Sequence, residues 1–221
     1  LALGAAIPVS FSMISHAAAQ PSGAETAIAA DALHLYSASL WAGGLFILLA
    51  ALVPTLRDLT AIGRQVVISR AVPRFSQIAV VAWSVMALTG FYAAWLSVGN
   101  LAALRQTPYG ESLTVKLLLL VPLLLLGAFN LFVVTRQMPA AKDEGGANRW
   151  SRNFSWVIAA ETALVVVVFL VVGLLVGQPP AREVIAQESE RITIPLAADG
   201  QLATLYLTPG ATGPNHYQLQ L

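Results

Sequence analysis

The sequence predicts an all-α integral membrane helix bundle of about five transmembrane helices, the first one truncated, followed by a partial C-terminal β-sandwich segment. Two observations support this fold class. Hydrophobic residues make up 57% of the 221 residues and charged residues 10%, whereas a soluble domain carries about 25% charged residues. The apolar residues also gather in long stretches, and about 20 of them cross a bilayer as a helix. A soluble globular fold is therefore nearly excluded.

Five apolar stretches are expected to form the helices of the bundle, and four of them are long enough to span a bilayer. The first begins at Leu1 and ends near His16. We interpret it as the outer part of a truncated transmembrane helix, because no basic residue precedes it; the alternative is a signal peptide. The five stretches cover residues 1–18, 32–54, 75–98, 112–134 and 154–176.

Basic residues in the connecting segments predict the orientation. Residues 55–74 and 136–153 each contain four Arg or Lys residues, whereas residues 99–111 contain only Arg105. Short loops rich in Lys and Arg remain on the cytoplasmic side, so we expect both basic segments to be cytoplasmic and the C-terminal segment to lie outside. Residues 60–69 mix polar and apolar side chains, which predicts a short amphipathic helix along the inner surface.

The chain divides near residue 178 into a transmembrane domain, residues 1–178, and a linker with the start of a β domain, residues 179–221. Strand-like runs at 192–196, 203–207 and 216–221 are separated by the turn signals Asp199-Gly200 and Pro209-Gly210. Three short strands make a poor independent domain. We therefore expect an incomplete β domain that continues beyond Leu221.

Composition limits the chemistry available to the protein. The chain has no cysteine, which excludes disulfides, iron–sulfur clusters and thiolate zinc sites. Any metal site must use His, Met, carboxylate or backbone oxygen ligands. The net charge of +1 gives no global field that would attract nucleic acid. Without a nucleophile elbow, phosphate loop or HExxH motif, we expect no enzyme activity.

A candidate metal site combines the ends of the first two apolar stretches. Met13 and His16 are three residues apart, and so are Asp31 and His34, which places each pair on one helix face. Imidazole and thioether ligands suit copper, cuprous ion in particular, and Asp31 is a candidate ligand or a partner that orients His34. The alternative is that Asp31 caps a helix opened by His34 and that both histidines are interfacial polar residues.

Three further polar residues lie inside or near the apolar stretches. Glu161 lies about 12 Å from the inner end of its helix at 1.5 Å per residue, and Asn130 falls at a similar depth on the preceding helix. They form either a proton or cation relay or a hydrogen-bonded structural pair. Lys116, near the outer end of the fourth stretch, either snorkels outward or pairs with a carboxylate such as Asp31.

Several of these residues also lie in motifs that resemble the copper resistance protein D (CopD) family of bacterial inner-membrane proteins. The resemblance covers about residues 1–178. The tail, with Leu207-Thr208-Pro209-Gly210 and Gly213-Pro214-Asn215-His216, is similar to the YtkA/FixH-like domain that follows CopD in fused copper proteins of the YcnJ type. The motifs are Ser15-His16-Ala17, Asp31-Ala32-Leu33-His34-Leu35, Trp41-Ala42-Gly43-Gly44-Leu45, Leu88-Thr89-Gly90 and Thr107-Pro108-Tyr109-Gly110 with Lys116; Asn130 and Glu161 also match.

The resemblance implies a copper-binding protein of the bacterial inner membrane that functions in copper uptake or resistance. It implies His16, Asp31 and His34 as the outer copper site, and a CopC-like copper carrier as a partner. Met13 is added from the residues alone. Two alternatives remain open: a membrane redox protein with haem between two histidines, and a non-catalytic anchor for the outer β domain.

Overall fold

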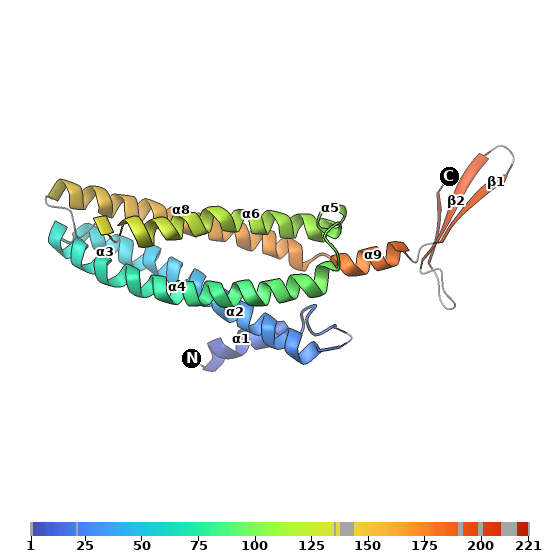
Figure 1. The fold of residues 1–221 in the computed structure, drawn as a ribbon, viewed down its shortest axis with the longest axis horizontal. Coiled ribbons are helices and arrows are strands. Elements are labelled where there is room, and N and C mark those ends of the chain that lie inside the picture. The colour runs from blue at the N-terminus through green and yellow to red at the C-terminus, as the bar shows by residue number, and fades with distance from the viewer. Residues whose placement is uncertain are drawn as a thin grey trace.

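The computed structural model describes residues 2–20, 22–134, 136–137, 144–189, 192–198, 201–208 and 216–220. Long helices run side by side, and a shorter helix and a sheet extend from one end of them (Figure 1). Within the described residues, four helical segments are long and apolar enough to cross a membrane: Ala24–Asp58, Ala61–Val98, Pro108–Val133 and Asn148–Glu188. The prediction of a helical membrane bundle is thus confirmed, with four candidate spans instead of five.

The first apolar stretch forms only a short helix. Helix α1 (Ala2–Ser12) has 11 residues and, at 1.5 Å per residue, is much shorter than the hydrocarbon layer. It packs against α2 (Ala24–Ile47). Helix α2 begins eight residues earlier than the predicted stretch and continues through a π-helical turn, η1 (Leu48–Leu52), into α3 (Val53–Asp58).

Helix α4 (Ala61–Val98) is a single 38-residue helix, so the prediction of a separate amphipathic helix at 60–69 is wrong. The Thr60 side chain caps it by accepting a hydrogen bond from the Gly63 backbone N–H at 3.2 Å. The amphipathic segment is the first part of this helix, and Ile68 is completely buried in the bundle core. Tertiary packing of its apolar face explains why it does not lie separately on the membrane surface.

Helix α6 (Pro108–Phe129) begins at the Thr107-Pro108-Tyr109-Gly110 motif, and Thr107 is its N-cap residue. Thr107 Oγ1 accepts from the Gly110 backbone N–H at 3.0 Å and donates to the Ala103 carbonyl at 2.8 Å. A Cβ at Gly110 would overlap the backbone of Ala103 and Leu104. The motif therefore holds the short helix α5 (Ala103–Gln106) tightly against the start of α6.

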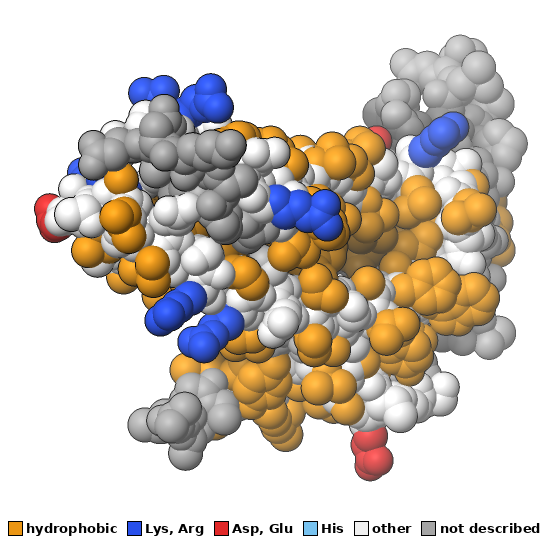
Figure 2. Space-filling model, turned by 60° about the vertical axis from the view of Figure 1, so that its left-hand side comes forward, with side chains coloured by type: hydrophobic (Ala, Val, Ile, Leu, Met, Phe, Trp, Pro, Cys, Tyr) orange, Lys and Arg blue, Asp and Glu red, His pale blue; other side chains and the backbone are white. Residues whose placement is uncertain are grey.

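The four long helices enclose a large apolar core, to which α2, α4, α6 and α8 (Glu144–Val176) all contribute, and a smaller apolar cluster lies around α5 and the start of α9. Side chains on the opposite surfaces are apolar and exposed, for example Leu88 and Phe91, each 74% exposed. Hydrophobic side chains cover much of the face shown in Figure 2, and most of its Lys and Arg side chains lie in the left half. An apolar outer surface of this extent fits a lipid environment. The buried core residues include Trp41, Leu45, Val72, Leu123, Phe154, Ile158 and Val165.

The glycine pair Gly43-Gly44 supports packing at one position. A Cβ at Gly44 would overlap the ring of Phe75 from α4, whereas a Cβ at Gly43 would meet nothing within 4 Å. Gly44 therefore makes room for a side chain instead of a neighbouring backbone.

The tail contains a helix that the sequence analysis missed and the three strands that it predicted. Helix α9 (Ala181–Ser189) follows Pro179-Pro180, since proline is favoured at helix starts. The Arg182 side chain ties it to the bundle by donating to the Trp95 carbonyl at 3.1 Å. Strands β1 (Ile192–Ala198), β2 (Gln201–Thr208) and β3 (His216–Gln220) form an antiparallel sheet in the order β1-β2-β3, with Leu205 opposite Ile194 and Leu219.

After η2 (Asn130–Val134), which ends the α6 span, part of the second basic segment lies outside the described residues. Lys142 belongs to that part. The turn residues Asp199-Gly200 and Pro209-Gly210 of the tail also lie outside the described residues. The division of the chain at residue 178 and the completion of the sheet into a β-sandwich stay predictions.

Candidate metal centre

The imidazole of His34 is held by a threonine from the neighbouring helix. His34 Nδ1 lies 3.0 Å from Thr89 Oγ1 of α4, and the Thr89 hydroxyl donates to the Val85 carbonyl at 2.7 Å. When the Thr89 hydroxyl donates to Val85, its oxygen is the acceptor for Nδ1–H of His34. Neutral imidazole protonated at Nδ1 has its lone pair on Nε2, the form in which histidine ligates a metal.

Gly90 provides the space that the His34 ring occupies. A Cβ at Gly90 would lie 3.2 Å from His34 Cε1, closer than ordinary side-chain contacts. Thr89 orients the ring and Gly90 accommodates it, which gives the Leu88-Thr89-Gly90 motif a physical role. Its link to His34 was not predicted, although a polar residue beside glycine within an apolar stretch is a usable signal in the sequence.

Asp31 and Lys116 lie in the electrostatic environment of His34. The structure brings these three predicted residues together from α2 and α6, and Asp31 interacts electrostatically with both partners. The Ser15 hydroxyl donates to Asp31 Oδ2 at 3.1 Å, which ties the segment after α1 to α2. Helix α2 begins at Ala24 with Gly23 at its N-cap. The alternative in which Asp31 caps a helix opened by His34 is therefore wrong.

His16 and Met13 lie in the turn that follows α1, and both side chains are exposed, Met13 by 62%. In the part of the chain that the structure describes, no group of three or more His, Asp or Glu side chains is close enough together to hold a metal ion. The ligand set of His16, Met13, Asp31 and His34 therefore stays a prediction. What the structure contributes is the oriented His34 and the Ser15–Asp31 link beside His16.

A second polar pair is buried deeper in the bundle. Glu161 of α8 is 5% exposed and Asn130, the first residue of η2, is 4% exposed. The Glu161 carboxyl group faces Asn130 and packs against Gly127, where a Cβ would lie 3.4 Å from Oε1. Within the described part of the chain, neither Oδ1 nor Nδ2 of Asn130 meets the geometric criteria of a hydrogen bond. The relay and the hydrogen-bonded structural pair both stay predictions.

Glu161 and Asn130 line a pocket of about 430 Å³ between the four long helices. Trp41 and Trp83 also line it, in an edge-to-face arrangement with ring centroids 5.4 Å apart. Trp41 follows His34 by seven residues on α2, about 10 Å along the helix. The pocket therefore lies roughly two helical turns deeper in the bundle than His34.

These features define a class: an integral membrane helix bundle with polar side chains at two depths. Residues 69–175 match the model of the family "Copper resistance protein D". The chain is also similar to the copper transport protein CutJ of Bacillus subtilis (strain 168), with 29% identity over 195 residues. The similarity covers 86% of this chain, which spans about a third of the relative's length, 32%. No solved structure matches the chain.

The comparisons confirm the resemblance to CopD. They name copper resistance and copper transport, and neither name denotes an enzyme. The match begins at residue 69, within α4, so it includes Thr89, Lys116, Asn130 and Glu161 but not His16 or His34. The resemblance of the tail to a YtkA/FixH-like domain stays a prediction.

Proposed function

We propose that the chain is the membrane domain of an inner-membrane copper protein that takes up copper or confers copper resistance, and that copper is captured at the outer end of α2. The observation that supports it most directly is the His34–Thr89 hydrogen bond of 3.0 Å, with the Thr89 hydroxyl directed at Val85. This geometry presents Nε2 of His34 as a ligand. The similarity to copper resistance and copper transport proteins is the reason for proposing copper as the metal.

His16 and Met13 complete the proposed site with His34. The Ser15–Asp31 hydrogen bond anchors the residue next to His16 one helical turn from His34, and the exposed side chains of Met13 and His16 are free of the apolar core. Two imidazoles and a thioether make a soft ligand set suited to cuprous ion. Asp31 supplies the negative charge that attracts the cation, and Lys116 balances it after the copper leaves.

The pair of Glu161 and Asn130 is proposed as a second, deeper station. An intramembrane carboxyl group beside an amide without hydrogen bonds offers oxygen ligands or a proton relay to a passing cation. The pocket that both line is large enough for ordered water, which commonly satisfies buried polar groups. Copper would therefore pass from the His34 end towards the ends of α3 and α4, where the basic segments lie.

The orientation follows the distribution of basic residues. Residues 55–74 and 136–153 would face the cytoplasm of a bacterium, and the His34 end and the C-terminal segment would face outward. A CopC-like carrier would then deliver copper to the outer end of α2.

A cuprous-ion competition titration tests the proposal. Detergent-purified protein competes with a chromogenic chelator, beside His16→Ala, His34→Ala and the double variant. The chain has three histidines, so His216→Ala in β3 is the matched control. Tight binding by the unmodified chain and by His216→Ala, lost in the double variant, is the expected result. Unchanged affinity in the double variant would refute the site, and a Soret band in protein expressed with ample haem would support the redox alternative.

A further inference from the structure

A second pocket lies at the end of the bundle that carries the basic segments. Its volume is about 460 Å³, and its lining comes from η1, α3, α4 and α8. Three arginines contribute to it, Arg57 from α3, Arg64 from α4 and Arg152 from α8, and the described residues that line it include no carboxylate. The formal charge of the lining is therefore +3, which calls for an anionic occupant.

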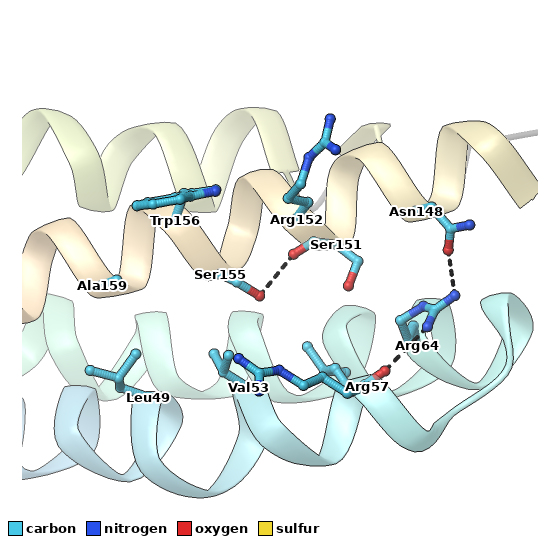
Figure 3. A pocket seen from close by; sticks show the side chains of 11 residues that line it. Leu49, Val53, Arg57, Arg64, Asn148, Ser151, Arg152, Ser155, Trp156 and Ala159 are labelled. Carbon is cyan, nitrogen blue, oxygen red and sulfur yellow. Dashed lines mark hydrogen bonds between the residues drawn. The ribbon is translucent and has the colours of Figure 1, made fainter.

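Arg64 is built into the pocket wall by two hydrogen bonds. Its Nη1 donates to the Leu56 carbonyl at 3.3 Å and its Nη2 donates to Asn148 Oδ1, contacts that join α3, α4 and α8 (Figure 3). Among the residues that the structure describes, its buried Nε has no hydrogen-bond partner. A buried guanidinium donor without an acceptor is costly. A phosphate oxygen, which guanidinium groups bind well, would satisfy it.

The pocket is polar at one end and apolar at the other. Arg64 and Asn148 lie at the polar end, the Arg57 side chain extends towards Val53, and Arg152 lies at the rim and points away from α3 (Figure 3). Leu49 precedes Arg57 by eight residues and Ala159 follows Arg152 by seven. Both walls thus become apolar within about 10–12 Å along their helices. Trp156, which lines the apolar part, is 72% exposed, as expected of a ring at a membrane interface.

This pattern matches a phospholipid better than a free anion. A soluble phosphate would use only the arginine end, whereas a phospholipid places its phosphate among the basic side chains and its acyl chain along Leu49, Val53 and Ala159. Basic pockets between transmembrane helices are a known means of binding anionic headgroups. We propose that this pocket binds one anionic phospholipid from the leaflet on the side of the two basic segments, with its phosphate near Arg64 and Arg57 and with Arg152 adding positive charge at the rim.

The site is independent of copper and rests only on the chain spanning a membrane. Such a lipid would fill the space between α3 and α8. It would thereby connect α8, which carries Glu161, with α3, which continues from α2 and its His34.

Native mass spectrometry of the protein released from neutral phosphatidylcholine nanodiscs, titrated with phosphatidylglycerol, tests the proposal. The test variant is Arg57→Gln/Arg152→Gln, which keeps the structural Arg64. The control is Arg70→Gln/Arg74→Gln, which removes the same charge from exposed positions of α4 outside the pocket. A third variant, Ala159→Phe, fills the apolar end, and a titration with inorganic phosphate probes the polar end alone.

The unmodified chain and the control are expected to retain one phosphatidylglycerol molecule. The Arg57→Gln/Arg152→Gln variant should bind it about thirty-fold more weakly, because each basic side chain contributes roughly a fivefold factor to anionic lipid binding. Ala159→Phe should weaken lipid binding without changing the response to phosphate. Equal lipid retention by the two double variants would overturn the proposal. Complete displacement of the lipid by inorganic phosphate would also overturn it and assign the arginines to a soluble anion.

Discussion

At the scale of single residues, the polar side chains of this protein depend on partners from neighbouring helices. Asp31 and His34 were paired from their spacing, and the structure adds Ser15, Thr89 and Lys116 around them. Thr89 is the most informative addition, because its own hydroxyl hydrogen is directed at Val85. Its oxygen is therefore left to accept from His34, which sets the tautomer of the proposed ligand.

Replacing Thr89 by valine tests this role. Thr89→Val keeps the shape of the side chain but removes the acceptor for His34 Nδ1–H, so the ring loses its preferred orientation. Loss of such a supporting hydrogen bond typically costs about 10–100-fold in metal affinity. We expect a cuprous-ion affinity at least about tenfold lower in the chelator competition. Thr114→Val is the control, because the Thr114 hydroxyl donates to the Gly110 carbonyl of its own helix; equal affinities in both variants would contradict the assignment.

At the scale of helices, local patterns predicted the elements well and their boundaries less well. Helix α2 begins at Ala24 and not near residue 32, and α4 absorbs the segment predicted as a separate amphipathic helix. Both differences have the same cause. Residues 24–31 and 61–74 are too polar to count as membrane-spanning by hydropathy, yet they extend helices whose other turns pack in the bundle.

Two glycines offer a matched test of helix packing. Gly110→Ala places a Cβ against the backbone of Ala103 and Leu104, whereas Gly43→Ala meets nothing within 4 Å. Overpacking against backbone costs about 1–3 kcal/mol, while alanine is favoured over glycine in an unobstructed helix by roughly 0.5–1 kcal/mol. We expect thermal unfolding in detergent to shift down for Gly110→Ala and to stay level or rise for Gly43→Ala. Equal shifts in the two variants would argue against the tight contact between α5 and α6.

At the scale of the whole molecule, the bundle separates three polar regions along its axis. His34 lies about two helical turns from the pocket that Glu161 and Asn130 line, and the arginine pocket lies at the far end of the same helices. The proposed path of copper follows this axis. In this proposal, copper capture depends on His34 and copper passage depends on Glu161 and Asn130, so experiments can separate the two steps.

Glu161→Gln tests the separation. It keeps the size of the side chain and removes the carboxylate from the deeper station, so we expect copper flux into proteoliposomes to fall strongly while cuprous-ion affinity in detergent stays unchanged. Glu183→Gln, at an exposed position of α9, is the control for loss of an acidic group. Unchanged flux in Glu161→Gln would assign the residue a structural role only.

The sequence by itself determined the membrane class, the helical spans, the three strands and the short list of polar residues that need an explanation. These properties follow from composition and from hydrophobic runs, which act locally along the chain. Only the tertiary structure decided that Thr89 and Gly90 hold His34, that Asn130 faces Glu161, and that three arginines line one pocket. Such meetings depend on how each helix is rotated and shifted against its neighbours, and in an apolar bundle many side chains across the interface together determine that fit.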